Sequence, residues 1–479
     1  MVTHPCPTRR AAAARHLIEL LEPLVSNESD QKEQQGRSNP HNHPYDHHIH
    51  GLIPAIKALL PTLHADRPLF AAFHDGQVHD PLGAGAYAFC NDLIGPLLLS
   101  LANDESPKGN EDMVRAITPA TFPTRPIIVH AGAQPNNSPH AGTLVVFCYA
   151  FSLARALLAR VQQANSQNAP GPKISVEITF VDTAPVENEG CQVDGVRFQR
   201  SHRDTPGALA THMADYSEVL RLLSAWSGIP FRTTFQADFF AHPAVPSLLA
   251  YLVDRRGRLG AQLSPKSHAL ALRAACPVPS CALAEKHGLL NQYAPGHISF
   301  YCPHHGYHGI SLSQPDEVVR LEANAPARNL IRSMLHLLDQ DTHHVRITGA
   351  DYAGTYQEAL LYRPLAEWSA STGLATGRTP HILYAPQVVD WSGAKLSKQL
   401  YVREGGYAAM ELLGTDGLRS YARLKSRFGD EGLVRIWSEV EKWVADPRKL
   451  FRAGFSVEYM QAVLDAEGNG DGKGVVSSN

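Results

Sequence analysis

A short turn between an apolar run and a helix-like segment constrains this chain more than any other feature. Residues 126–132 read P-I-I-V-H-A-G, a β-branched run that is typical of a buried strand. The turn Q-P-N-N-S-P follows, and residues 144–158 are apolar over a length that suits a helix. The stretch therefore predicts a strand, a tight turn and the start of a helix.

The turn before this helix is a candidate anion-binding site. The first N–H groups of a helix have no partner within the helix, and the helix dipole places positive charge at the same end. Phosphate binds readily there, and Gly142 would let a ligand approach the backbone closely. Turns of small residues before helices are common in α/β folds, so a purely structural turn is the alternative interpretation.

A second stretch late in the chain adds weight to the first. Residues 393–399 read G-A-K-L-S-K-Q and follow a predicted strand at 381–385. H-A-G-T at 140–143 and K-L-S-K-Q at 395–399 resemble the two ATP-binding motifs of class I aminoacyl-tRNA synthetases, H-I-G-H and K-M-S-K-S. Thr143 stands in place of the second histidine and Gln399 in place of the last serine. The order and the setting of the two motifs match this family.

This resemblance implies an α/β fold with a doubly wound parallel sheet of the Rossmann-like, class I synthetase type. The alternation of strand-like and helix-like segments independently favours such a sheet. The further elements that we expect are a strand at 174–181, a helix at 206–226, a third strand within 231–240, helices within 243–275 and at 325–338, a strand at 344–348, a helix at 354–368 and a strand at 381–385.

We expect the catalytic core to cover residues 121–402. Residues 1–120 predict a helical extension with a disordered polar loop near 26–46, whose irregularly spaced histidines favour a solvated loop over a metal site. Residues 403–464 predict a short helical region, and 465–479 a disordered tail. A chain of 479 residues, 44% of them hydrophobic, can bury one large core and an insertion.

Composition limits the compartment and the partners. A net charge of −3 gives no global electrostatic footprint for nucleic acid, although a local basic patch is compatible with it. No run approaches the roughly 20 apolar residues of a membrane helix, so we expect no membrane association. Seven cysteines in so long a chain argue for a reducing compartment, and we expect the cytoplasm. The basic, alanine-rich N-terminus leaves a transit peptide as the alternative.

Cysteine and histidine residues cluster within 270–312, which predict a small zinc-binding insertion. Cys276 and Cys281 form one close pair, and Cys302 and His305 form a second pair about 20 residues later. Tetrahedral zinc is usually held by two such pairs, and thiolate and imidazole are the ligands that it prefers. A closed set of four would make the zinc structural.

Two alternatives remain for this cluster. His304 or His308 could replace His305 as the fourth ligand, or the residues could be free thiols and surface histidines without metal. The resemblance is relevant here, because class I synthetases, and the class I lysyl type in particular, often carry such an insertion between the two halves of the nucleotide fold. The chain is therefore expected to be nearest to the lysyl type.

The resemblance also implies a reaction and its residues. An amino acid would attack ATP, accompanied by Mg²⁺, to give an aminoacyl adenylate and pyrophosphate, and transfer to tRNA would follow. His140, Lys395 and Lys398 would be catalytic. The residues expected to bind ATP are Gln134, Asn137, Gly142, Thr143, Gly349, Asp351 and Ser397, and those expected at the substrate are Asp182, Tyr356 and Gln357.

Two of these acids also follow predicted strands. Ligands of open parallel sheets collect at the carboxyl ends of the strands, where Asp182 and Asp351 would lie. Asp351 belongs to a G-A-D sequence that resembles the G-x-D of the family, and Tyr356 and Gln357 come one turn later. For both acids, a helix cap or turn is the alternative role.

The acceptor of the activated amino acid is left open. About 80 residues follow the lysine loop, fewer than the lysyl type uses for an anticodon-reading domain. A stand-alone ligase that acylates a small amine or thiol is therefore one alternative. A catalytically inactive relative that binds tRNA or a protein is another, and a nucleotidyltransferase of the same superfamily is a third. Acidic residues after the second strand hint at an amino acid with a cationic side chain.

Overall fold

The computed structural model describes residues 92–105, 118, 122–164, 171–353, 358–372, 381–390, 392–396, 405–449 and 454–466. Most of the expected N-terminal extension, its polar loop and nearly all of the C-terminal tail lie outside these residues. The predicted site residues Tyr356, Gln357, Ser397 and Lys398 lie outside them as well.

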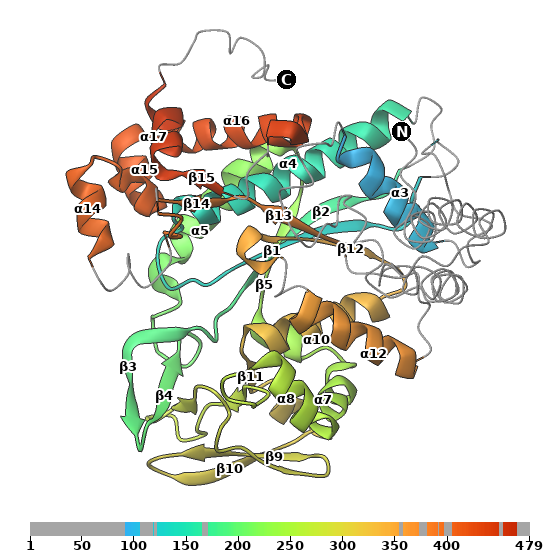
Figure 1. Ribbon diagram of the computed structural model, residues 1–479, viewed down its shortest axis with the longest axis vertical. Helices are drawn as coiled ribbons and strands as arrows, with labels where there is room; N and C mark the ends of the chain where they lie inside the picture. The colour runs from blue at the N-terminus through green and yellow to red at the C-terminus, as the bar shows by residue number, and fades with distance from the viewer. Residues whose placement is uncertain are drawn as a thin grey trace, which may run out of the picture.

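A five-stranded sheet forms the centre of the molecule, and all of its strands are parallel (Figure 1). The strands are β1 (Ile127–Ala133), β2 (Ile174–Phe180), β5 (Phe231–Phe235), β12 (His343–Gly349) and β13 (His381–Ala385). Their spatial order is β13-β12-β1-β2-β5. Counted along the chain this is the 3-2-1-4-5 order of a doubly wound fold, with the switch point between β1 and β12. The predicted parallel α/β sheet is confirmed.

Helices cover both faces of this sheet (Figure 1). On one face, α4 (Ala141–Ala164), α5 (Ala210–Ser227), α3 (Ile94–Glu105) and α16 (Glu431–Ala445) contribute to one buried apolar cluster. On the other face, α10 (Ala325–Leu338) and α12 (Arg363–Thr372) contribute to a second. Strand β13 divides its side chains between them, because Leu383 belongs to the first cluster and Tyr384 to the second. Coverage on both faces explains why the parallel strands are so apolar.

Between β5 and β12 the chain forms a large insertion. Its elements are α6 (Gln236–Phe240), α7 (Val245–Asp254), α8 (Arg256–Leu263), β6 (Leu272–Ala274), β7 (Ala284–Glu285), β8 (Gln292–Ala294), β9 (His297–Cys302), β10 (Gly306–Ser311), α9 (Pro315–Val318) and β11 (Leu321–Ala323). Leu252, Phe300 and Ile310 are buried together with residues of α10. The segment at 270–312 is therefore one part of a larger layer with its own core.

A hairpin that the sequence analysis did not expect follows β2. It consists of β3 (Pro185–Val193) and β4 (Val196–Ser201), which pair antiparallel, and β7 adds a third strand. Asp194 and Gly195 connect the strands at φ values of 47° and 79°. A two-residue turn with two positive φ angles is favourable for Asp-Gly and matches the twist of a hairpin.

The third strand is shorter than expected. Only residues up to Phe235 are in β5, and residues 236–240, which we expected to continue the strand, form α6. The carboxylate of Asp238 accepts a hydrogen bond from the Phe235 N–H at 2.8 Å. This contact satisfies an N–H group at the start of the helix and marks where the strand ends.

The C-terminal region packs on the core. It comprises β14 (Gln387–Val389), α14 (Gly406–Leu412), α15 (Tyr421–Phe428), α16, β15 (Gly454–Ser456) and α17 (Val457–Asp465), with short helical turns at Asp416–Arg419 and Pro447–Lys449. At the start of α15, the Tyr421 N–H donates to the carbonyl of Pro139 at 2.7 Å, and the Ala422 N–H to the hydroxyl of Ser138 at 3.2 Å. The helical region therefore holds the turn that precedes α4.

Helix α4 also departs from one expectation. The segment Ala141–Gln163 is long and apolar enough to cross a membrane by length and composition alone, which the sequence analysis did not foresee. Of its most apolar window, 67% is buried inside the protein. Burial between the sheet and α16 explains the apolar composition, as for the core helix of a globular protein.

Candidate functional site

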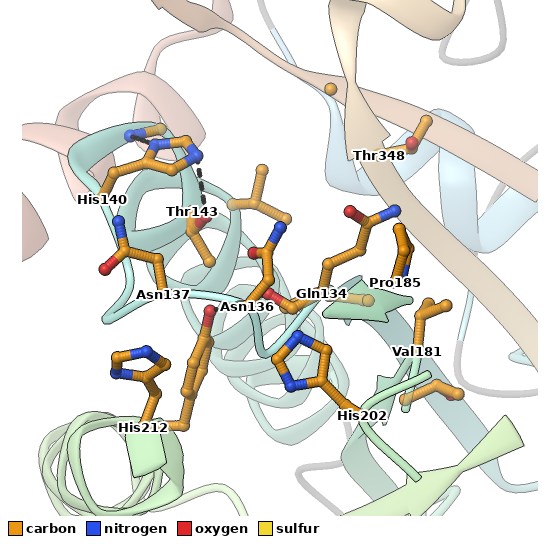
Figure 2. A pocket seen from close by; sticks show the side chains of 18 of the residues that line it. Gln134, Asn136, Asn137, His140, Thr143, Val181, Pro185, His202, His212 and Thr348 are labelled. Carbon is orange, nitrogen blue, oxygen red and sulfur yellow. Dashed lines mark hydrogen bonds between the residues drawn. The ribbon is translucent and has the colours of Figure 1, made fainter. Parts of the chain in front are cut away.

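A cavity of about 1520 Å³ opens at the carboxyl ends of β1 and β12. This is the switch point of the sheet, where ligands of doubly wound folds bind. Figure 2 shows Asn137 and His140 on one side of the space and Thr348 across from them. The residues of the sequence-predicted site that line the cavity are Gln134, Asn137, His140, Gly142, Thr143, Gly349, Asp351 and Lys395.

The ring of His140 is fixed against the first turn of α4. Its Nδ1 accepts a hydrogen bond from the Gly142 N–H at 3.1 Å, and its Nε2 lies 3.3 Å from the hydroxyl of Thr143. Because Nδ1 is an acceptor, the neutral ring carries its proton on Nε2, where it can donate. The N–H groups of Thr143 and Leu144 donate to the His140 carbonyl at 2.8 and 3.0 Å. Donation of the Gly142 N–H to phosphate, which we expected, would require its bond to His140 to break.

Burial determines the charge of this ring. Desolvation, together with the positive charge of Lys395, lowers the pKa of His140 to about 4. The ring is therefore neutral at physiological pH. It does not act as a cation, and its Nε2–H could donate to a ligand in place of the Thr143 hydroxyl, which lies 3.3 Å away.

The loop after β13 brings a lysine to the same cavity. The Lys395 ammonium lies 3.1 Å from a carboxylate oxygen of Asp351, which follows β12 in the short turn Ala350–Tyr352. The loop is fixed by the Asp390 carboxylate, which accepts from the Ala394 N–H at 2.9 Å, and by a bridge between Val389 and Lys395. The pair joins the segments that follow the neighbouring strands β12 and β13, and the carboxylate partly neutralises the ammonium.

Gly349 is required between these two charges. A Cβ at this position would lie 2.5 Å from an oxygen of Asp351 and 3.9 Å from the Lys395 ammonium. The first distance is shorter than real Cβ contacts allow, so a side chain here would displace the Asp351 carboxylate.

Asp182 is placed differently from the other predicted residues. Its carboxylate is buried, accepts from the Gln236 N–H at 3.1 Å and is not among the residues that line the cavity. Burial raises its pKa. The contact lies at the first residue of α6, which corresponds to the helix-cap alternative. Its role at the substrate stays a prediction.

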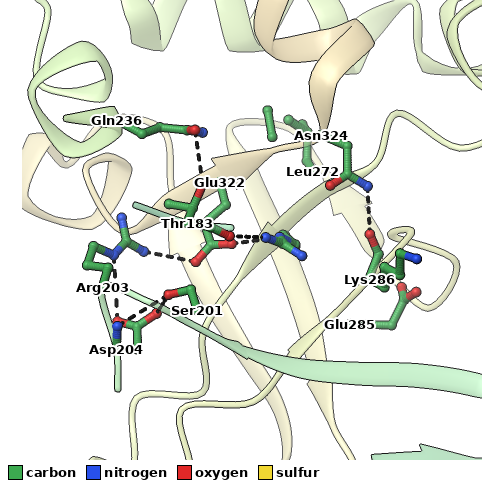
Figure 3. Close-up of polar contacts among 12 residues, drawn as sticks. Thr183, Ser201, Arg203, Asp204, Gln236, Leu272, Glu285, Lys286, Glu322 and Asn324 are labelled. Carbon is green, nitrogen blue, oxygen red and sulfur yellow. Dashed lines mark hydrogen bonds and ion pairs between the residues drawn. The ribbon is translucent and has the colours of Figure 1, made fainter. Parts of the chain in front are cut away.

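A buried charge network beside Asp182 fixes the hairpin to the insertion (Figure 3). Glu322 of β11 is 1% exposed, and its carboxylate pairs with Arg273 of β6 at 2.6 Å and with Arg203 at 3.1 Å. Arg203 follows β4 and also lies 3.6 Å from Asp204. Two arginines on one buried acid satisfy the desolvated charge, so the hairpin wall of the cavity has a fixed position.

Sequence reasoning missed the arginines of the cavity. Arg328 and Arg332 of α10, Arg346 of β12 and Arg197 of β4 all line it. A signal existed, because Arg328 and Arg332 are four residues apart in a predicted helix, and Arg346 interrupts an apolar strand. Which face of the helix would meet the strand was not available from the sequence.

The four predicted zinc ligands converge outside the cavity. The ligand atoms of Cys276, Cys281, Cys302 and His305 all lie within 4.8 Å of one another. The two sulfurs of Cys281 and Cys302 are 3.5 Å apart, and Nδ1 of His305 lies 3.4 and 3.6 Å from the sulfurs of Cys276 and Cys302. Bond lengths to zinc imply separations of about 3.6–3.8 Å between tetrahedral ligands. The donor set and its spacing therefore fit this metal.

The position of the cluster suits a structural metal site, because it packs against the β3–β4 hairpin. Phe198 of β4 is buried against these cysteines together with Leu283, and Cys191 of β3 packs beside them. His304 and His308 are not part of the converging set in the described chain. A metal here would brace the hairpin that forms one wall of the cavity.

Comparisons with known proteins give distant structural matches only. No family model matches the chain, and no curated protein matches it. A glutamate-tRNA synthetase from Elizabethkingia anophelis is 12% identical with a TM-score of 0.24, and the match covers 57% of this chain and 53% of that one. A glutamate tRNA ligase from Elizabethkingia meningosepticum, solved in complex with its amino acid, is 9% identical with a TM-score of 0.25 and coverages of 58% and 53%.

The Thermus thermophilus arginyl-tRNA synthetase is 11% identical with a TM-score of 0.28, over 77% of this chain and 64% of that one. The chain spans about half the length of the first two structures. None of these three is a lysyl enzyme, so the expected closeness to the lysyl type receives no support from them. At such TM-scores the likeness carries no argument, and the fold rests on the strand order and the site on the geometry above.

Proposed function

We propose that this protein activates an amino acid with ATP through an aminoacyl adenylate and transfers it to tRNA. The observation that carries the proposal is the meeting of two distant loops in one cavity. His140 before α4 and Lys395 after β13 line the same space at the switch point between β1 and β12. Each loop belongs to one of the two sequence motifs that resemble the class I ATP-binding motifs.

The proposed reaction requires that the amino-acid carboxylate and ATP are held in line and that the charge on the phosphates is neutralised, and it requires no covalent bond to the protein. The amino-acid carboxylate attacks the α-phosphorus of ATP, the bond to the β-phosphate oxygen breaks, and pyrophosphate leaves. In the proposal, His140 donates from Nε2 to a phosphate oxygen, and Lys395 neutralises charge that develops on the pyrophosphate. Lys398 and Ser397 would act from the same loop, and Mg²⁺ would accompany ATP as part of the substrate.

A stand-alone ligase with a small amine or thiol as acceptor is the second candidate. One observation favours it: the described helices after the lysine loop pack against α4 and the turn at 138–140, as the bonds of Tyr421 and Ala422 show. These helices stabilise the site and do not extend as a separate module. In either case we propose a structural zinc ion at the Cys276 cluster and a reducing compartment such as the cytoplasm.

The test is amino-acid-dependent exchange of labelled pyrophosphate into ATP. We expect exchange with one or a few of the twenty common amino acids, and a loss of about 100-fold or more in Lys395→Met and His140→Asn. Lys442→Met is the matched control, because Lys442 pairs with Glu439 on α16 outside the cavity. No exchange with any amino acid, despite measurable ATP binding, would favour the inactive relative.

The acceptor is then identified directly. The adenylate, formed with the active amino acid, is offered total tRNA and a mixture of small amines and thiols in separate reactions. Label in tRNA supports the first candidate, and label in a small molecule with none in tRNA supports the second.

A further inference from the structure

One part of the cavity lies between the segments that follow β1 and β2, the base of the β3–β4 hairpin and α5. We call it the hairpin subsite, and its residues are Gln134, Val181, Pro185, His202, His212 and Tyr216. None of them is an acid, a lysine or an arginine. Figure 2 shows the ring of His202 at the edge of this space, near Gln134 and Val181.

The charged lining residues belong to other parts of the cavity. Those of α10 come from the face of the sheet opposite to α5, and Asp351 and Lys395 follow β12 and β13, which lie on the other side of β1 from β2. In the hairpin itself, Arg197 pairs in register with Gln192 near the turn, whereas His202 is at the base. The hairpin subsite is therefore a polar but uncharged end of the cavity.

The backbone of His202 is fixed where the hairpin ends. Its N–H donates to the carbonyl of Ala184 at 2.9 Å, and the N–H of Arg203 donates to the carbonyl of Asp182 at 2.8 Å. The side chain of Arg203 pairs with the buried Glu322 at 3.1 Å. These bonds hold His202 against the segment that follows β2, so the fold determines where its ring lies.

The ring of His202 is buried without a hydrogen-bond partner. The residue is 6% exposed, and neither Nδ1 nor Nε2 makes a hydrogen bond with any described residue. The backbone of Ala208 lies near the ring but outside hydrogen-bonding geometry. Burial lowers the pKa of His202, as does the charge of His212, and the backbone of Ala208 partly opposes the shift. The neutral ring has one donor and one acceptor, and either nitrogen can turn to the cavity because this torsion is broad.

Other buried polar groups beside the ring already have partners. The hydroxyl of Tyr216 donates to the carbonyl of Gln134 at 3.2 Å, and the hydroxyl of Thr179 accepts from that of Thr234 at 3.1 Å. Buried polar atoms in native proteins nearly always have a partner, in the protein, in water or in a ligand. His202 is therefore the buried polar group of this wall that is left for a ligand.

We infer that the hairpin subsite binds an uncharged side chain of the amino-acid substrate, one that carries a hydroxyl or a carboxamide, and that His202 selects it. Each of these groups offers a donor and an acceptor, so each can pair with whichever ring nitrogen faces it. A site built to hydrogen-bond such a group rejects an apolar analogue of the same shape, because its own polar atoms would stay unpaired. The inference rests on the proposed function.

This side chain differs from the cationic one that the acidic residues after the second strand suggested. Asp182 does not line the cavity, and Glu189, which does, pairs with Arg200 at 3.4 Å. The hairpin subsite thus offers no described carboxylate to balance a cationic side chain.

Direct binding to the full chain tests the inference without turnover. Calorimetry, with and without a non-hydrolysable ATP analogue, compares amino acids in pairs of similar shape: L-threonine with L-valine, L-asparagine with L-leucine, L-glutamine with L-methionine, and L-tyrosine with L-phenylalanine. In at least one pair we expect the polar member to bind about tenfold or more tightly than the apolar one. It should also bind more tightly than L-lysine and L-glutamate.

Variants of His202 assign this preference to its ring. His202→Phe removes both nitrogens and keeps a planar ring, so it should reduce the preference within that pair to about twofold or less and leave ATP affinity unchanged within about twofold. His202→Gln keeps an amide and should retain part of the preference. His287→Phe is the matched control, because His287 lies outside the cavity. If His202→Phe does not fold, as judged by its thermal transition, His202→Ala is measured in its place.

Three results would overturn the inference. They are equal affinity within all four pairs, tighter binding of L-lysine or L-glutamate than of every polar member, and a preference that persists in His202→Phe. No binding of any of these amino acids in either condition would also count against it. A more stable His202→Phe with an unchanged preference would assign the unpaired nitrogens to the fold alone. Selective binding without any pyrophosphate exchange would contradict the proposed function and leave the subsite in place.

Discussion

At the scale of single residues, the site depends on how closely His140 and Gly142 fit. The imidazole lies over the first turn of α4 because the Gly142 N–H donates to its Nδ1. A Cβ at position 142 would lie 3.0 Å from Cε1 of His140 and 3.1 Å from its Nδ1. Glycine therefore allows the ring to approach the backbone, and that approach places Nε2 3.3 Å from the hydroxyl of Thr143, which also lines the cavity.

Gly142→Ala should reduce activity without unfolding the protein. The added methyl group has to move the ring by a few tenths of an ångström, and small displacements of a positioning group lower rates substantially. We expect pyrophosphate exchange to fall roughly 3–10-fold, with an unchanged thermal transition. Gly257→Ala is the matched control, because a Cβ at Gly257 of α8 meets no atom within 4 Å. Equal exchange in Gly142→Ala and wild type would remove the positional role of the ring.

The protonation of His140 predicts a flat pH profile. Its pKa is lowered to about 4, so the neutral ring is present throughout the range from pH 6 to 8. Exchange should not vary with an apparent pKa near the ordinary histidine value of about 6.5, and it should decline only as the pH approaches 4. Exchange rates measured between pH 4.5 and 8.5 test this. An inflection near 6.5 that disappears in His140→Gln would contradict it.

At the scale of elements, continuous patterns were predictable and contacts between elements were not. The bounds expected for β13 and α10 agree with the structure, because β13 is a short continuous apolar run and α10 has apolar residues at helical intervals. The β3–β4 hairpin was missed although its Asp-Gly turn is a strong local signal. The short strands β14 and β15 were missed because three residues show no period.

In the candidate site, too, residues in continuous motifs were predictable and residues brought together by contacts between elements were not. His140 and Lys395 could be named in advance because each belongs to a short continuous motif, and the fold brings both to one cavity. The cavity arginines Arg328, Arg332 and Arg346 could not, because they come together only where one face of α10 meets β12. Asp182 could be named from the sequence, but its role could not. An acid that follows a strand can either bind a ligand or accept a hydrogen bond from the first N–H groups of a helix. Here its carboxylate accepts from the N–H of the first residue of α6.

Metal content tests the proposed zinc site beside the β3–β4 hairpin. We expect about one zinc per chain, measured by mass spectrometry of the metal, and close to none in a Cys276→Ser, Cys302→Ser double variant. Cys191→Ser is the matched control, because Cys191 packs beside the cluster but is not one of the four converging residues. Zinc retained by the double variant would disprove the assignment.

At the scale of the whole molecule, a polar chain crosses the central sheet beneath α10. Glu177 of β2 pairs with Arg232 of β5 and, at 3.3 Å, with Nδ1 of His130 on β1. The other nitrogen of His130 lies 2.8 Å from Nδ1 of His344 on β12, and His344 contacts Asp339 at 3.0 Å. Four adjacent strands are thereby linked, and His336 of α10 stacks on the rings of His130 and His344, so the protonation of these groups concerns the stability of the entire sheet.

The pKa values of His130 and Glu177 are both lowered in the folded protein, so both shifts make stability fall as the pH falls. Burial is the main reason that the pKa of His130 falls to about 4, partly opposed by Glu177. Burial alone would raise the pKa of Glu177, but the hydrogen bond with His130 and the charges of His130 and Arg232 lower it to about 2. Below pH 6.5 the unfolded chain binds a proton at His130 that the folded protein does not bind, and below pH 4.5 the same holds at Glu177. The free energy of unfolding should therefore fall with pH through both windows.

His130→Gln should remove the first of these losses. We expect the free energy of unfolding of the wild type to decrease by roughly 1–3 kcal/mol from this group between pH 7 and pH 4.5, and the variant to be less stable at pH 7 but to lose less on acidification. Urea denaturation at pH 7.0, 5.5 and 4.5 measures both slopes. His242→Gln is the control, because His242 is exposed at the start of the insertion. Parallel pH dependence in wild type and His130→Gln would mean that the buried chain does not govern the acid stability of the sheet.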